Sequence, residues 1–241
     1  MDIDSRFRDG VQHFWSTRDA QRQKQRESGR EDAGLRGAVT GGAQMRELER
    51  LVVDLLIEAG LDALDVRTRT SLELPGYFRP TKKWDLLVVS NGQLVTAIEF
   101  KSQTAPSFGN NVNNRAEEAI GNATDIWTAY REGRFGHGPR PFLGYFFLLE
   151  DCPPVRQRVR NKEPLFAVDP VFKVASYSQR YEILCRRLVL ERLYDTACFT
   201  LSTNEPNTQI SHPADDLTFH RFVAELQGHA QRFVQQKRFD G

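Results

Sequence analysis

The segment Phe142–Leu149 is apolar at nearly every position, and it limits the fold more than any other part of the chain. Such a run is typical of a β-strand that is buried on both faces, as in sheets that contain parallel strands. A strand of this kind needs helices on both sides of its sheet, because both faces must be shielded from water. We therefore expect an α/β fold in which helices flank a mixed central β-sheet.

The rest of the chain supplies helices and strands for this arrangement. Apolar residues recur at three- and four-residue spacing in segments that predict helices at 44–59, 114–130, 177–193 and 215–238. Strand-like segments lie at about 64–74, 83–90 and 93–101, and a short edge strand is expected at 197–201. No internal repeat and no clear boundary separates these elements, so we expect one domain that spans residues 1–241.

Residues 1–43 are expected to form a flexible or partly helical arm. Val11, Phe14 and Trp15 are suited to dock one short helix, whereas residues 18–42 are polar, charged and rich in glycine, which is typical of a loop. Basic arms sometimes become ordered on nucleic acid, but a plain flexible connector has the same composition.

The composition excludes several classes of protein. No stretch approaches the roughly 20 apolar residues of a membrane-spanning helix, and residues 1–10 lack the apolar core of a secretory signal. The three cysteines, at positions 152, 185 and 198, show no metal-ligand spacing and fit neither a disulfide scaffold nor a structural zinc site. We therefore expect a cytoplasmic protein without a membrane partner.

Charge is balanced over the whole chain but not along it. The chain has 33 Lys and Arg residues and 32 Asp and Glu residues, which excludes a global basic field. Residues 156–192 hold nine basic and four acidic side chains, and residues 67–101 hold six and three. Two basic segments on a neutral chain suit a polyanion bound in one cleft, although random clustering on a solvated surface gives the same pattern.

The residues that carry chemistry lie on two predicted strands joined by a turn at Asn91-Gly92. Glu99 and Lys101 share one face of the second strand, because successive side chains point to opposite faces. Asp85 lies at the start of the first strand. Two carboxylates with oxygen ligands are suited to a hard divalent cation, and a nearby ammonium group can orient water and stabilise a developing anion. The backbone carbonyl of Phe100 is a further candidate metal ligand.

The strand register decides whether these groups can meet. A strict two-residue turn pairs Ser90 with Gln93 and places Asp85 opposite Ile98, so that Asp85 faces away from Glu99. A functional site therefore requires a loop with an odd number of residues or a β-bulge. Without either, Asp85 is an acid at the edge of a strand, and Glu99 and Lys101 form an exposed pair of little energetic value.

Asp85, a gap of thirteen residues, and then Glu99-Phe100-Lys101 resemble the PD-(D/E)XK nuclease motif. Longer strings are similar to the XhoI-type family of type II restriction endonucleases, namely PGYFRPTKKWDLLVV, EFKSQTAPSFGNNVNNRAEEAIGNATDIWTAYREG, YFFLLEDC and SYSQRYEILCRRL. The similarity spans about residues 40–190. Trp84 replaces the proline of the general motif and leaves the predicted metal ligands in place.

The resemblance implies a restriction-endonuclease-like core and an Mg²⁺-dependent homodimer that cuts both strands of double-stranded DNA. The implied target is the palindrome CTCGAG, and the implied products carry 5′-phosphates. Asp85 and Glu99 then become metal ligands and Lys101 the catalytic lysine. A companion DNA methyltransferase, a separate protein that acts on the same site, is also implied.

A dense amide cluster follows the second strand and is predicted to be a loop that leads into the helix from Asn114. Asparagine can pair with adenine and arginine with guanine, so we predict DNA contacts from Asn110, Asn111, Asn113, Asn114 and Arg115. The alternative is a turn and a helix cap, for which asparagine is also favoured. Further predicted contacts to DNA are Ser102, Gln103, Ser107, Arg79, Lys82 and Lys83.

Two other functions remain open at this point. One is a DNA-binding protein that has kept a nuclease fold without catalysis, and the intact Asp85, Glu99 and Lys101 argue against it. The other is a structure-specific repair or recombination nuclease, against which the asparagine cluster and the long family-like strings argue.

Overall fold

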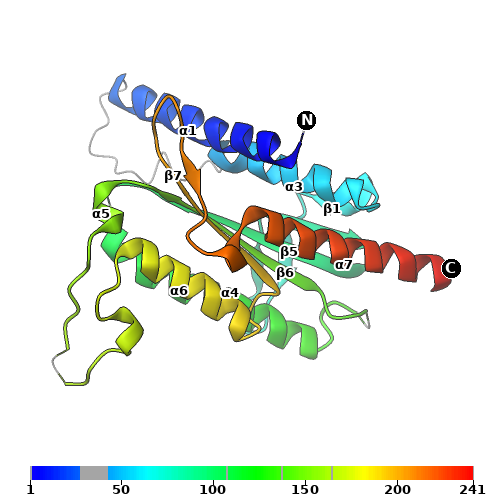
Figure 1. Cartoon of the computed structure of the whole chain (residues 1–241). Coiled ribbons are helices and arrows are strands. Elements are labelled where there is room, and N and C mark those ends of the chain that lie inside the picture. The colour runs from blue at the N-terminus through cyan, green and yellow to red at the C-terminus, as the bar shows by residue number, and fades with distance from the viewer. Residues whose placement is uncertain (1, 28–42, 107, 137, 164, 241) are drawn as a thin grey trace.

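The computed structural model describes residues 2–27, 43–106, 108–136, 138–163 and 165–240. Its centre is a six-stranded mixed sheet in the order β1-β4-β5-β6-β7-β8 (Figure 1). The parallel pairs are β5–β6 and β6–β7, and the other neighbours are antiparallel. The strands are β1 (Val66–Arg67), β4 (Leu86–Ser90), β5 (Gln93–Gln103), β6 (Phe142–Glu150), β7 (Thr196–Ser202) and β8 (Ile210–Ser211). The expected α/β fold with a mixed, helix-flanked sheet is confirmed.

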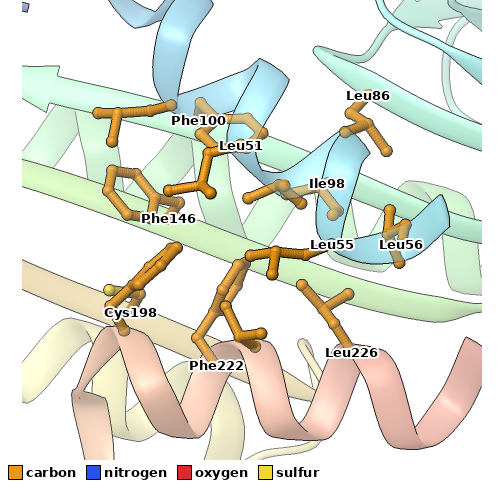
Figure 2. Close-up of a cluster of buried hydrophobic side chains, with 14 of the residues drawn as sticks. Leu51, Leu55, Leu56, Leu86, Ile98, Phe100, Phe146, Cys198, Phe222 and Leu226 are labelled. Carbon is orange, nitrogen blue, oxygen red and sulfur yellow. The ribbon is translucent and has the colours of Figure 1, made fainter. Parts of the chain in front are cut away.

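Three helices cover one face of this sheet, namely α1 (Ile3–Glu27), α3 (Arg46–Glu58) and α7 (Phe219–Asp240). Figure 2 shows Leu51 and Leu55 of α3 and Phe222 of α7 converging on the sheet. They pack in one buried cluster with Ile98 of β5 and Phe146 of β6, whose side chains are fully buried. This apolar layer holds the strands in place beneath α3 and α7.

The opposite face is covered by α4 (Phe108–Arg131) and α6 (Tyr177–Leu190). Tyr145 and Phe147 of β6 point to this side, and Tyr181 of α6 stacks on Phe147 with ring centroids 4.4 Å apart. The central strand β6 is therefore buried on both faces, as its apolar run predicts. The helix α6 begins with a capping box formed by Ser176 and Gln179, which fixes its first turn.

A second, two-stranded sheet lies beside the main one and consists of β2 (Glu73–Pro75) and β3 (Thr81–Lys83). The single strand expected at 64–74 is wrong, because the chain divides into β1 and β2. Ser71 lies between them with a φ of 56°, a left-handed conformation that ends an extended strand. The remaining short elements are η2 (Ala43–Met45), η3 (Ala63–Asp65), α5 (Pro153–Arg156), η4 (Pro170–Phe172) and η5 (Asp215–Leu217).

The N-terminal segment is more ordered than its composition predicts. Helix α1 continues to Glu27, so the loop expected from residue 18 is wrong as far as position 27. Phe14 and Trp15 are buried, and the indole Nε1 of Trp15 donates to Ser202 Oγ at 3.0 Å. The part of the predicted arm at 28–42 lies outside the described residues.

Two other expectations about elements are corrected. Helix α4 begins at Phe108 rather than at 114, because Phe108 and Val112 are buried one turn apart and continue the apolar face backwards. Strand β7 is not an edge strand: it lies between β6 and β8, and all of its residues are buried. No helix in the described ranges is both long and apolar enough to cross a membrane.

A matched pair of substitutions tests the packing of the central layer. A Cβ added at Gly144 in β6 would lie 3.2 Å from Phe222 Cε2, and that ring is fully buried, so we expect Gly144→Ala to destabilise the fold by about 1–3 kcal/mol. Gly228 in α7 has open space, so Gly228→Ala is expected to stabilise the protein by about 0.5–1 kcal/mol. Denaturant unfolding measures both, and equal effects would contradict this account of the core.

Candidate active site

A β-bulge brings the two predicted acids to one place. Strands β4 and β5 are joined by the two-residue turn at Asn91-Gly92, and Ser90 pairs with Gln93. Val88 pairs with Thr96 but Val89 pairs with Leu94, so Val95 is the extra residue of a bulge. The register after the bulge pairs Leu86 with Ile98, and one further step aligns Asp85 with Glu99. The structure therefore contains the β-bulge that the sequence analysis required for a functional site.

Asp85 directly precedes β4, which begins at Leu86. Its Oδ2 accepts a hydrogen bond from the backbone N–H of Phe100 at 2.8 Å, and its Oδ1 accepts none within the described residues. Burial raises the pKa of Asp85, and the positive charge of Lys101 and the Phe100 N–H oppose this shift. The backbone of Phe100 therefore holds one oxygen of the Asp85 carboxylate, and the other oxygen could bind a metal ion.

Glu99 is the most deeply buried of the ionisable groups at this site, with 1% of its side chain exposed. Its Oε1 contacts the ammonium Nζ of Lys101 at 2.5 Å and that of Lys82 at 3.3 Å. Its Oε2 accepts from Asn122 Nδ2 at 2.8 Å. Burial alone would raise the pKa of Glu99, but the two lysines and Asn122 outweigh it, and the net shift is downward. Glu99 is therefore held as a carboxylate.

Lys82 reaches the site from the separate β2–β3 hairpin. Its Nζ also donates to the carbonyl of Lys83 at 2.8 Å and lies 4.6 Å from the centroid of the Trp84 ring. Burial lowers the pKa of Lys82, and the Glu99 carboxylate opposes that shift. The sequence predicted Lys82 as a DNA contact, whereas the structure places it directly on Glu99.

A hydrogen-bond network extends from Glu99 through α4 to the end of the hairpin. Asn122 Oδ1 accepts from Arg79 Nη2 at 2.7 Å, and Arg79 Nε donates to Asp125 Oδ2 at 2.8 Å. Asp125 Oδ1 accepts from the backbone N–H groups of Tyr77 and Phe78, both at 2.8 Å. Burial would raise the pKa of Asp125, but these two N–H groups and Arg79 lower it overall. Arg79, predicted as a DNA contact, is thus part of a clasp.

A cleft of about 560 Å³ opens beside Asp85. Its lining includes Asp85, Trp84 and Glu49, together with the basic side chains Arg46, Arg50, Arg69 and Lys83. Burial and the nearby Asp85 raise the pKa of Glu49 to about 7. With Glu47 the lining holds three acids and four basic side chains, so cations that can bind a polyanion lie beside the carboxylates that its reacting group must approach.

The arrangement fits a hard divalent cation. In a β-strand the N–H and C=O of one residue point to the same side, so the Phe100 carbonyl faces the Asp85 side with its N–H. Asp85, Glu99 and this carbonyl form an oxygen donor set of the type that Mg²⁺ binds while keeping several waters. In the described parts of the chain, no three His, Cys, Asp or Glu side chains form a metal-binding group, so the carbonyl and waters must complete such a shell.

The other predicted DNA contacts lie in different surroundings. The asparagine cluster is the start of α4 and not a loop: Asn113 and Asn114 are exposed, whereas Arg115 is half-buried and pairs with Glu118 at 2.6 Å. Gln103 is buried, Ser102 is half-buried and Lys83 is exposed. Asn110 and Asn111 also belong to α4, and Ser107 lies outside the described residues.

Sequence reasoning missed three residues of the site and its supporting network: Glu49 lines the cleft with Asp85, Asn122 donates to Glu99, and Asp125 binds Arg79. Asn122 and Asp125 interrupt the apolar face of α4 formed by Ala119, Ala123 and Ile126, and both are buried. A polar side chain on a predicted apolar face was the available signal. Glu49 had no such signal, because it lies among other charged residues of α3.

The raised pKa of Glu49 predicts how stability depends on pH without metal or DNA. Between pH 4.5 and about 7 the folded protein binds a proton at Glu49 that the unfolded chain has lost, so stability falls as pH rises through this window. Across this window the Glu49→Gln variant should lose about 1 kcal/mol less unfolding free energy than the parent, which corresponds to about 2–4 °C in Tm. Thermal melts from pH 4.5 to 7.5 measure it, with the exposed Glu132→Gln as control. Parallel curves for parent and Glu49→Gln would contradict this assignment.

Comparisons with known proteins agree with this geometry. The family model described as "Restriction endonuclease XhoI" matches residues 24–212. The type II restriction enzyme BstVI of Geobacillus stearothermophilus is 47% identical over 205 residues, which cover 82% of this chain and 92% of that enzyme. AbrI of Azospirillum brasilense is 51% identical over 166 residues (68% and 74%), and XhoI of Xanthomonas vasicola is 46% identical over 184 residues (76% and 73%). No solved structure matches. The chain belongs to the XhoI restriction endonuclease family.

Proposed function

We propose that the protein is a type II restriction endonuclease that makes double-strand breaks in DNA by Mg²⁺-dependent phosphodiester hydrolysis. The observation that carries this proposal is the bulge-dependent alignment of Asp85 with Glu99, with Lys101 on the Glu99 carboxylate and a basic cleft beside them. The enzymes BstVI, AbrI and XhoI, to which the chain is similar, are type II restriction enzymes by description and support the same conclusion.

Each residue of the site has a role in this proposal. Arg46, Arg50, Arg69 and Lys83 bind backbone phosphates and place the scissile phosphate near Asp85. Mg²⁺, held by Asp85, Glu99 and the Phe100 carbonyl, would supply positive charge that polarises the phosphate and offsets the charge that develops on it. Lys101 orients the attacking water and stabilises the forming anion. Asn122 and Lys82 hold Glu99 in position and keep it ionised.

The target and the assembly follow from the family resemblance. We propose the palindrome CTCGAG as the target and 5′-phosphates at the cut ends. A palindrome is read most simply by a protein two-fold axis, so the active form would be a homodimer in which each subunit covers one half-site. A separate DNA methyltransferase that modifies the same site would protect the host DNA in the cytoplasm.

Incubation of a sequenced supercoiled plasmid with the protein and Mg²⁺ tests this function and its rivals. We expect discrete fragments with ends at CTCGAG. Smears or nicks would indicate a structure-directed nuclease, and a gel shift without cleavage would indicate a DNA-binding protein without catalysis. Either of these outcomes contradicts the proposal.

Asp85→Ala should reduce cleavage by at least about 100-fold, because it removes a carboxylate from the proposed metal site. Specific DNA binding should persist in Ca²⁺, whose larger and looser shell positions water poorly. Single-turnover cleavage rates and binding titrations measure the two effects. The exposed Glu205→Ala is the control, and full activity of Asp85→Ala would refute the role of this carboxylate.

Lys101→Ala should lose cleavage by a similar factor, since its ammonium group acts near the charge of the transition state. Lys101→Arg should also fail, because a planar guanidinium does not replace a compact ammonium group. Lys24→Arg, an exposed position on α1, is the matched control for the Lys-to-Arg change. Single-turnover rates close to those of the parent in both Lys101 variants would mean that this lysine only supports the fold.

A further inference from the structure

Two large aromatic side chains project into solvent at the end of the β2–β3 hairpin. Tyr77 is 50% exposed and Phe78 is 71% exposed, although most aromatic residues of the described chain are buried. Their ring centroids lie 4.9 Å apart at an interplanar angle of 80°, an edge-to-face pair. We call Tyr77 and Phe78 the aromatic tip.

The aromatic tip is rigidly held although it is exposed. Its two backbone N–H groups donate to Asp125 of α4, and the N–H of Gly76 closes the turn on the carbonyl of Pro80 at 3.2 Å. A Cβ at Gly76 would lie 2.5 Å from both the Arg79 carbonyl and Asp125 Oδ2, so only glycine fits this approach. These contacts fix the backbone from which the two rings project, so binding would cost little further backbone entropy.

The anchor of the tip is the same network that holds the catalytic carboxylate. Asp125 binds Arg79, Arg79 binds Asn122, and Asn122 donates to Glu99, each through a hydrogen bond of 2.7–2.8 Å. The same hairpin also delivers Lys82 to Glu99 from its second strand. The backbone of the aromatic tip is therefore connected to Glu99 through the hydrogen-bonded side chains of Asp125, Arg79 and Asn122.

Charge around the tip favours a nucleic acid over a protein surface. Of the basic side chains in residues 71–83, Arg79 pairs with Asp125 and Lys82 pairs with Glu99, whereas Lys83 is exposed. Lys83 also lines the cleft beside Asp85, together with Arg46, Arg50 and Arg69. An exposed aromatic element on the hairpin that supplies a cation to this cleft suits a duplex, whose phosphates meet the cations of the cleft while its bases and sugars offer apolar surface.

From this geometry we propose that the aromatic tip contacts duplex DNA next to the scissile phosphate, with Tyr77 and Phe78 packed on base and sugar surface. This inference rests on the proposed nuclease function and adds a DNA-contacting element to it. The Arg79–Asp125 clasp acts as its positioning support. The contact is apolar, so it contributes affinity without releasing counterions.

The test is a set of binding titrations in Ca²⁺ on the cognate duplex at several salt concentrations, followed by single-turnover cleavage in Mg²⁺. We expect Tyr77→Ala/Phe78→Ala to bind at least about tenfold more weakly than the parent, as for the loss of aromatic contacts to bases. The dependence of log K on log salt should keep its slope, because no phosphate contact is lost. Both rings are exposed, so Tm should stay unchanged; the single variants Tyr77→Ala and Phe78→Ala serve if the double variant is unstable.

The matched control is Phe166→Ala, since Phe166 is 86% exposed in the segment between α5 and η4. It should bind and cut as the parent does. Unchanged affinity and cleavage in the tip variant would overturn the proposal, as would a reduced salt slope, which indicates lost phosphate contacts. Weaker binding that follows from a changed oligomeric state in sedimentation would assign the tip to a protein interface and also overturn it. A parent that neither binds nor cuts duplex DNA contradicts the proposed nuclease function itself.

Discussion

The buried charge of Glu99 is the constraint on which the rest of the site depends. A carboxylate with 1% exposure is costly unless it is paired and hydrogen-bonded. Its compensation comes from three different elements: Lys101 on β5 itself, Lys82 on the β2–β3 hairpin and Asn122 on α4. These elements must therefore dock together for the fold to tolerate the acid. The small hairpin, which has only a two-stranded sheet of its own, is tied to the main body in this way.

Much of the architecture could be predicted from local patterns. The apolar run of β6 indicated a strand buried on both faces, and the periodicity of α3, α6 and α7 indicated helices that the structure contains. The register argument also succeeded, since it required an odd loop or a bulge, and the structure has the bulge at Val95. The sequence could not show whether an odd loop or a bulge occurs, because either one turns Asp85 to the face of the sheet that carries Glu99.

The failures have a common physical cause in tertiary packing. The asparagine-rich start of α4 has weak helix propensity, yet Phe108 and Val112 bury their side chains and extend the helix over it. The polar end of α1 is helical because it extends a helix whose earlier residues Phe7, Val11 and Phe14 pack in the core. The clasp between Arg79 and Asp125 joins residues 46 apart, and no local pattern encodes such a pair.

The two acids of the site differ in a way that suits metal-dependent chemistry. Two ammonium groups lower the pKa of Glu99, whereas burial raises the pKa of Asp85. Of the two Asp85 oxygens, only Oδ2 accepts a hydrogen bond within the described chain. Without a cation, the lysines therefore neutralise Glu99 but leave the cost of ionised Asp85 largely unmet. Asp85, Glu99 and the Phe100 carbonyl would hold a divalent cation, whose positive charge would offset the cost of ionised Asp85. Lys101, which neutralises Glu99 in the folded chain, is also the residue that the proposed function assigns to orienting water, so one ion pair would serve both the stability of the buried acid and the proposed chemistry.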